Sequence, residues 1–314
     1  MDYQETLARL AEADERIIVM TAENRAAIRD LPSRLGKRFI DVGISEATMI
    51  GAAAGLALRG RIPVTHALAT FLTLRAFEFI RTDVGLPNLP VKLVGGVPGI
   101  LSEANGPTHQ AIEDVALMRG IPNVCVFAPA DELELVEGMQ QIMEHPAPWY
   151  VRFNSCAAPV THSPFQIGSA EQFGDGNDVA ILTYGYLLGE AMTAMRELEA
   201  LGVNARVVNM RTLKPADTEM ILHVAEETRL VVTLEDHFRT GGLYSIVCET
   251  LIANRLAAAV FPIAFEERWF TPALIGDVLE AEGLRGAQIA TRVADALEAE
   301  TAAPAAGLFN GLRG

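Results

Sequence analysis

The sequence contains only three cysteines, Cys125, Cys156 and Cys248, and none of them has the CxxC spacing of a redox or zinc motif. Thiols that are so few and odd in number indicate a reducing compartment. Basic residues are also scarce: 25 Lys and Arg stand against 40 Asp and Glu, and the net charge is −15. This balance argues against nucleic acid and anionic membrane surfaces as partners, because both need clustered cations.

Targeting and membrane segments are missing as well. No apolar run approaches the roughly 20 residues that a membrane-spanning helix needs. The first residues, 1–5, are acidic and lack the basic start and apolar core of a signal peptide. We therefore expect a cytoplasmic protein. Since half of the 314 residues are hydrophobic, the chain can bury a large core, and its length suggests two domains.

Apolar runs of strand length alternate with longer amphipathic segments along the whole chain. Near-continuous apolar strands separated by helix-length segments predict an α/β fold, in which helices cover both faces of largely parallel sheets. The predicted strands are 16–20, 91–96, 123–127, 149–153, 178–184, 205–209, 230–234 and 260–265.

A turn-rich segment divides the chain. Helical periodicity is lost between residues 157 and 177, where Pro159 and Pro164 occur. We place a linker at 161–176, between a first domain at 1–160 and a second domain at 177–300. The stretch 301–314, which includes Ala-Ala-Pro-Ala-Ala-Gly, is expected to be a mobile tail.

The most informative segment is Gly43-Ile44-Ser45-Glu46 with the small residues that follow it. Ser45 is positioned to cap a helix, and Glu46 in the first turn complements the positive end of the helix dipole. The run 51–55 lacks bulk, so another backbone or a flat ligand can approach closely. Alone, the segment is better explained by a cap and a crowded helix–sheet contact than by a ligand site.

Further motifs favour the ligand. They are Arg38–Glu46, Thr70-Phe71, Asn88–Lys92, Gly106–Asp114, Arg119–Pro122 and Ala128–Asp131. Their order and spacing resemble the C-terminal half of transketolases over nearly the whole chain. The resemblance implies two α/β domains, an aminopyrimidine-binding domain and a transketolase C-terminal-like domain.

The same resemblance implies a thiamine-diphosphate-dependent transferase that moves a two-carbon ketol unit from a ketose to an aldehyde. The sequence has no credible site for the cofactor's diphosphate and its metal. We therefore expect one subunit of a split transketolase, with an N-terminal-type partner that binds the diphosphate and Mg²⁺ or Ca²⁺. The expected assembly is an α2β2 heterotetramer acting on small sugars.

Several residues match the family's cofactor site. Glu46 matches the glutamate that activates the cofactor through a nitrogen of the aminopyrimidine ring, and Phe71 matches the aromatic residue facing that ring. Ile44, Leu74 and Phe77 fall where further pocket walls are expected. The spacing of Phe71, Leu74 and Phe77 is also that of an ordinary core stripe on a helix.

Other residues match the substrate channel. His109 matches a histidine that can exchange protons with a sugar hydroxyl near neutral pH. Arg152 matches an arginine that binds the acceptor's phosphate. His66, Glu103 and Asn105 are further candidates for contact with substrate.

Three positions depart from the family. Val97 replaces a second channel histidine, Asn105 replaces an acidic residue, and Ala27 falls near a phosphate-binding serine. The residues that match the family's cofactor site are therefore retained, and those that match its sugar-binding site are altered. This combination predicts transketolase chemistry on an unusual sugar or sugar phosphate.

Alternative interpretations remain. Gly174-Asp175-Gly176 superficially matches a diphosphate motif, but it precedes a predicted strand, so a turn explains it better. Glu235-Asp236-His237 is expected to serve packing. The β subunit of a 2-oxo-acid dehydrogenase is a close rival, and a non-catalytic scaffold subunit is another. A nicotinamide dehydrogenase is disfavoured because no strand is followed by GxGxxG.

Overall fold

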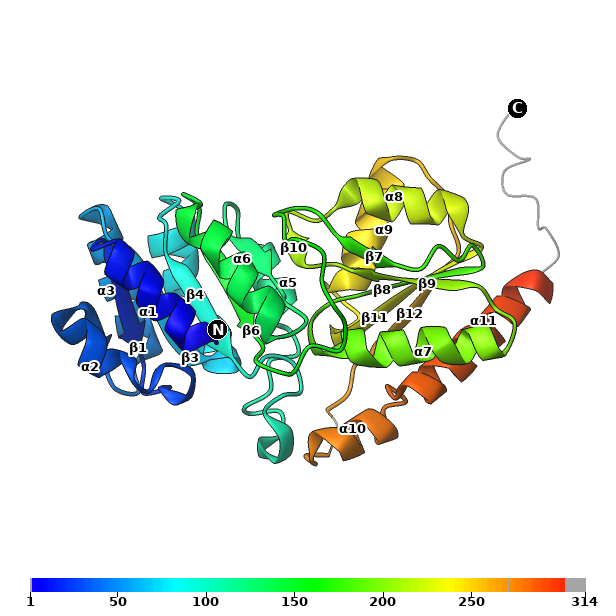
Figure 1. Ribbon diagram of the computed structural model, residues 1–314, viewed down its shortest axis with the longest axis horizontal. Helices are drawn as coiled ribbons and strands as arrows, with labels where there is room; N and C mark the ends of the chain where they lie inside the picture. Colours follow the sequence, from blue (N-terminus) through cyan, green and yellow to red (C-terminus); the bar gives the residue numbers. More distant parts are fainter. Residues whose placement is uncertain (1, 270, 303–314) are drawn as a thin grey trace.

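The chain forms two α/β units, each built on its own sheet (Figure 1). A computed structural model describes residues 2–269 and 271–302. The predicted fold class is confirmed, because both sheets are largely parallel and flanked by helices. All the predicted strands occur, and short or polar ones that the apolar pattern did not reveal join them.

The first sheet has seven strands, of which only one, β10, runs antiparallel to its neighbour. Their spatial order is β10 (Thr212–Lys214), β5 (Cys125–Phe127), β6 (Trp149–Phe153), β4 (Lys92–Gly96), β3 (Ile62–Leu68), β1 (Ile17–Thr21) and β2 (Phe39–Asp41). Since parallel neighbours end at the same edge, the loops after β2, β3 and β4 meet there.

Alternate residues of these strands bury themselves on opposite faces. Ile17 and Val19 of β1 pack with α1 (Tyr3–Ala13) and α6 (Glu132–Glu144). Ile18 and Met20 pack on the other face with α3 (Glu46–Leu58) and α5 (Asp114–Arg119). The remaining helical pieces are η1 (Ala26–Ile28), α2 (Leu31–Leu35), η2 (Gly36–Arg38), η3 (Phe71–Arg75), α4 (Phe77–Phe79), η4 (Ile80–Gly85) and η5 (Glu103–Asn105).

The second sheet has five strands, in the order β12 (Val260–Phe265), β11 (Leu230–Phe238), β8 (Val179–Thr183), β9 (Ala205–Asn209) and β7 (Glu171–Phe173). Helices α7 (Leu188–Ala200) and α11 (Gly286–Ala302) cover one face, and α8 (Thr218–Glu227) and α9 (Leu243–Ala253) cover the other (Figure 1). The short η6 (Gly185–Leu187) precedes α7, and α10 (Ile275–Ala281) precedes α11. None of the helices in the described ranges is long and apolar enough to traverse a bilayer.

The predicted linker is partly ordered into the second sheet. Strand β7 lies within 161–176 and pairs antiparallel with β9. In turn, β10 follows β9 in sequence and joins the first sheet beside β5. At the junction, β10 thus joins the first sheet although it follows β9 of the second, and β7 of the linker joins the second sheet. Of the predicted tail, residues 301 and 302 end α11, and 303–314 lie outside the described residues.

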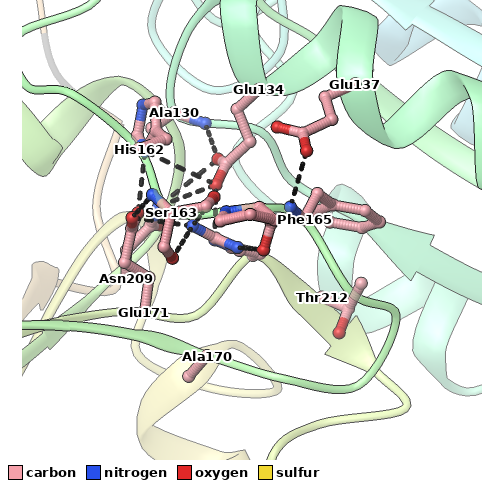
Figure 2. A network of polar contacts seen from close by, with 12 residues as sticks. Ala130, Glu134, Glu137, His162, Ser163, Phe165, Ala170, Glu171, Asn209 and Thr212 are labelled. Carbon is pink, nitrogen blue, oxygen red and sulfur yellow. Dashed lines mark hydrogen bonds and ion pairs between the residues drawn. The ribbon is translucent and has the colours of Figure 1, made fainter.

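A buried group of charged residues fills this junction (Figure 2). We call Asp131, Glu134, His162, Glu171 and Arg211 the junction network. The His162 ring contacts Asp131 through Nε2 at 2.6 Å and Glu171 through Nδ1 at 2.7 Å. The Arg211 guanidinium lies 2.8 Å from both Glu134 and Glu171. The His162 and Arg211 cations thus connect carboxylates of the first domain, including that of Glu134 in α6, to Glu171 in β7.

The surroundings keep the His162 ring charged. Burial lowers the pKa of His162, but its hydrogen bonds to Asp131 and Glu171 outweigh burial and raise it to about 10. Burial raises the pKa of Glu171, yet its bonds to His162 and Arg211 lower it to about 2. Both groups are therefore ionised at neutral pH, and each depends on the other for its charge partner.

We predict that His162→Gln lowers the free energy of unfolding by about 3 kcal/mol near neutral pH, because it leaves buried carboxylates without their cation. A histidine whose pKa is raised on folding contributes stability below its ordinary pKa and loses it as the pH rises through the folded value, about 10. The wild-type chain should therefore lose stability toward alkaline pH more steeply than the variant. Denaturant unfolding across this range measures both effects.

His223→Gln is the matched control, since His223 is half-exposed and pairs with Glu227 on the surface of α8. It should change the unfolding free energy by less than about 0.5 kcal/mol. Equal losses from the two substitutions, or parallel pH profiles for wild type and His162→Gln, would refute the role given to the junction network.

Candidate active site

Three loops meet at the carboxyl edge of the first sheet. The loop after β2 leads to Glu46, the segment after β3 carries Phe71, and the long loop after β4 carries His109. In open α/β sheets this edge is where ligands bind. Three sequence motifs that are far apart along the first domain thus come together.

Glu46 is the first residue of α3 and is only 5% exposed. The chain reaches it through a tight turn in which Gly43 has φ of 71° and donates its N–H to Asp41 at 2.8 Å. Ser45 occupies the N-cap position as predicted, but its hydroxyl bonds Thr48 at 2.6 Å instead of a backbone amide. The turn therefore presents a buried carboxylate at a helix start.

Phe71 and His109 are connected to that carboxylate through Arg75. The two rings pack edge to face with centroids 5.1 Å apart. The Arg75 guanidinium stacks on the Phe71 ring at 3.7 Å from its centroid, and its Nη1 lies 3.6 Å from Glu46 Oε1. Glu46, Arg75, Phe71 and His109 thus form one continuous chain of contacts.

The loop that carries His109 is held by backbone geometry. Gly106 has φ of 71°, and a Cβ there would lie 2.4 Å from Pro272 of the second domain. The His109 amide donates to the Gly106 carbonyl at 2.9 Å, and its ring Nδ1 contacts the Thr108 hydroxyl at 2.9 Å. Glycine at 106 is therefore required both by its dihedral angles and by contact with the second domain.

The neighbouring candidates on this loop face outward. Glu103 and Asn105 are both exposed, and the Asn105 amide donates to the Ser102 carbonyl at 3.0 Å. Among the described residues, neither forms a hydrogen bond, ion pair or ring contact with Glu46, Phe71 or His109. Their expected substrate contacts remain predictions.

The expected pocket walls divide into two kinds. Ile44 and Leu74 are 71% and 46% exposed, so they form an uncovered apolar rim beside Glu46. Phe77 is half-buried and packs against the core of the first domain. The sequence predicts Phe71, Leu74 and Phe77 roughly on one face of a regular helix. The segment is instead divided into a π-helical turn, η3, and the short α4. For Phe77 the structure favours the core interpretation.

His66 does not fit a proton-transfer role. It is 3% exposed, its Nδ1 lies 3.2 Å from the Met20 carbonyl, and its Nε2 lies 2.8 Å from the Tyr3 hydroxyl. A carbonyl only accepts, so Nδ1 carries the proton and Nε2 accepts from Tyr3. Burial lowers the pKa of His66 to about 4. The ring is thus neutral, and both of its nitrogens are occupied.

His66 nevertheless borders a cavity of about 750 Å³ at this edge of the sheet. Other lining residues are Asn24, Arg29, Leu68, Val97 and Ser155. Three carboxylates, those of Asp2, Asp30 and Glu132, also lie on its wall. Acidic residues thus outnumber the one arginine in the lining, which favours uncharged groups over anions.

Arg152, which is expected to bind a substrate phosphate, is buried and paired with two aspartates, and its phosphate contact remains a prediction. Its side chain is 3% exposed, with Nε 2.8 Å from Asp114 and Nη1 3.0 Å from Asp236. Burial lowers the pKa of Arg152, but the two carboxylates raise it well above its usual value. Two buried aspartates pair with Nε and Nη1 of this guanidinium, which links β6 to β11 beneath Gly99, and its Nη2 has no hydrogen-bond partner among the described residues.

The second-domain motif also has a structural role. Glu235 accepts hydrogen bonds from the backbone amides of Leu243 and Tyr244 at 2.7 and 2.9 Å, and burial raises its pKa to about 8. His237 accepts from the Ala116 amide at 3.3 Å. These bonds fix the start of α9 and the contact between the domains, in agreement with the packing role expected for this motif.

One described cluster has the composition of a metal site. Ligand atoms of Glu134, His162 and Glu171 lie within 4.8 Å of one another. They belong to the junction network, where the His162 and Arg211 cations already balance their charge. Gly174-Asp175-Gly176 lies in the loop between β7 and β8 with Asp175 exposed, and it precedes a strand as its position in the sequence predicted. Neither place adjoins Glu46 in the sheet order.

Arg75, Tyr3, Asp114 and Asp236 were missed as parts of these sites. Asp114 and Asp236 contact Arg152 across 38 and 84 residues, so no local pattern relates them. Arg75 follows Phe71 by four residues on η3, a spacing at which side chains of a helix meet, so a local pattern could have indicated this contact.

Comparison with known proteins identifies the two domains. Residues 2–159 match the pyrimidine-binding domain of transketolase, and residues 168–289 match the transketolase C-terminal domain. A 6-deoxy-6-sulfo-D-fructose transketolase subunit from a Clostridium species is 39% identical over 80% of each chain. A putative transketolase C-terminal section from Methanocaldococcus jannaschii is 33% identical over 95% of this chain and 96% of that protein.

Longer relatives and solved structures agree. A 1-deoxy-D-xylulose-5-phosphate synthase from a Synechococcus species is 37% identical over 93% of this chain, which spans 46% of the synthase. The solved structure described as a split gene transketolase, inactive beta4 tetramer, has a TM-score of 0.83 at 34% identity and covers 94% of this chain and 96% of that one. The chain therefore belongs to the transketolase family and corresponds to the C-terminal subunit of a split transketolase.

Proposed function

We propose that this chain works with an N-terminal-type subunit as a thiamine-diphosphate transketolase whose active site lies between the two. The assembled enzyme, an α2β2 heterotetramer, would transfer a two-carbon ketol unit to an aldehyde acceptor. The observation that carries this proposal is the buried Glu46 carboxylate beside the Phe71 ring. Their shared neighbour, the Arg75 guanidinium, is a flat group that bears N–H donors.

The aminopyrimidine ring fits the same description. It is flat, it stacks on an aromatic face, and its nitrogens form hydrogen bonds with a carboxyl group. Glu46 would hold a proton at the ring nitrogen, Phe71 would face the ring, and the small residues 51–55 leave room nearby. The cofactor, when bound, supplies a carbon nucleophile that attacks the sugar carbonyl.

Residues of this chain would also handle the substrate. His109 contacts Phe71 and is partly exposed, so its ring can give or take a proton at a sugar hydroxyl. The exposed rim of Ile44 and Leu74 would be covered by the partner, which would exclude water from Glu46.

The partner is inferred from what the described residues do not provide. Their one cluster of suitable metal ligands belongs to the junction network, and Gly174-Asp175-Gly176 lies in the loop between β7 and β8. The diphosphate and its Mg²⁺ or Ca²⁺ would therefore be bound by the N-terminal-type subunit. The relative described as a split gene transketolase supports this division.

The substrate is proposed to be an unusual sugar. Val97 lines the cavity where other transketolases carry a histidine, and Arg152 is engaged by two aspartates. Loss of hydrogen bonds to buried sugar hydroxyls costs about 1–3 kcal/mol each. The relative named as a 6-deoxy-6-sulfo-D-fructose transketolase subunit supports this proposal.

We predict that Glu46→Gln lowers turnover of the reconstituted pair by about 100-fold or more, equivalent to roughly 3 kcal/mol of barrier. An amide cannot exchange the ring proton, while the fold and assembly stay intact. Glu78→Gln, at an exposed glutamate of α4, is the control and should retain wild-type turnover. Wild-type turnover in Glu46→Gln would show that this residue only begins a helix, as a scaffold subunit requires.

We also predict that the pair uses xylulose 5-phosphate with ribose 5-phosphate poorly and prefers a donor with a deoxygenated, branched or otherwise altered skeleton. Steady-state kcat/KM values on a panel of ketoses measure this preference. Pyruvate belongs in the panel, because turnover with pyruvate as the best donor would favour a 2-oxo-acid enzyme or a synthase. Xylulose 5-phosphate as the clearly best donor would contradict the proposed specificity alone.

A further inference from the structure

We propose that Arg75 competes with the cofactor: in the subunit by itself, its guanidinium occupies the place of the aminopyrimidine ring. This inference rests on the proposed function, because it uses the same site. Binding of the ring and release of Arg75 would then be one event, and the free subunit would hold its own site closed.

The geometry points to competition because Arg75 contacts both groups that the ring would use. Its guanidinium carbon lies 3.7 Å from the Phe71 ring centroid, within the range of a stacked cation–π contact. Its Nη1 lies 3.6 Å from the Glu46 carboxylate. Two flat groups cannot stack on the same ring face and approach the same carboxylate together.

The contacts of Arg75 are weak enough to be broken. Its side chain is 52% exposed, and the separation from Glu46 exceeds hydrogen-bond distance. Ion pairs and cation–π contacts of partly exposed side chains contribute little. Arg152 offers the contrast, since it is 3% exposed and hydrogen-bonded to two aspartates. Arg75 can therefore leave, and Arg152 cannot.

The local backbone also favours movement. Arg75 ends η3, a π-helical turn, and Ala76 leaves the helical region with φ of −104° before α4 begins. Neighbouring Leu74 is exposed, so the turn has open space on one side. The guanidinium can swing away without displacing the buried residues of the same turn, Leu72 and Thr73.

An opposite role would give the opposite result. If Arg75 were a positioning residue that holds Glu46 for the ring, its removal would weaken binding. If it is a competitor, its removal raises the fraction of binding-competent subunits and strengthens binding, since apparent affinity scales with that fraction. The direction of the change therefore separates the two roles.

The test is calorimetric or NMR titration of the full chain with the cofactor's free ring fragment, 4-amino-5-hydroxymethyl-2-methylpyrimidine. Arg75→Ala should bind it about three- to tenfold more tightly than wild type. Arg81→Ala removes an exposed arginine from the next helical turn and should bind like wild type. Unchanged or weaker binding in Arg75→Ala would overturn the competition.

Phe71→Ala separates this inference from the proposed function, with thermal melting to confirm that the variant is folded. Loss of fragment binding in Phe71→Ala with no gain in Arg75→Ala would keep the ring site and reject Arg75 as its competitor. No binding to any variant, or binding that Phe71→Ala leaves unchanged, would reject the ring site itself and the competition with it.

Discussion

The charge pairing of His162 at the domain junction is the interaction on which the rest of the arrangement depends. A protonated imidazole lies between Asp131 of the first domain and Glu171 of the second sheet, and Arg211 completes the balance. Buried carboxylates this close together are unfavourable unless cations lie between them. The requirement fixes where β7 and the segment after β9 lie against α6. It also explains how an irregular segment can join two sheets in one defined orientation.

That orientation reaches the candidate active site through a second set of buried contacts. Arg152 joins Asp114 of the first domain to Asp236 of β11. Asp236 lies directly beneath Gly99, where a Cβ would come within 1.6 Å of its carboxylate, and the same loop packs Gly106 on Pro272. The second domain therefore supports the loop that carries His109 through contacts at Gly99 and Gly106. Arg152 thus has a structural role under this loop through its two aspartates.

The sequence predicted those features that depend on local pattern. Apolar runs marked the long parallel strands, and the turn before Glu46, the Thr-Phe pair and the Gly-Pro-Thr-His segment marked residues that the fold brings together. Features that depend on residues far apart in the sequence could not be predicted from it. The Tyr3 hydroxyl, 63 residues away, occupies Nε2 of His66. Asp236, 84 residues away, pairs with the Arg152 guanidinium. Strands β7 and β10 have only three residues each, and their pairing depends on the junction more than on their own hydrophobicity.

The central claim is that this chain provides half of a thiamine-diphosphate site: Glu46 and Phe71 for the ring, and no diphosphate site of its own. Its most direct test is calorimetric titration of thiamine diphosphate with Mg²⁺ into the chain alone and into the chain mixed with its N-terminal-type subunit. The account predicts weak binding to the chain alone, through the ring, and tight binding to the pair. Sub-micromolar binding to the chain alone would contradict it.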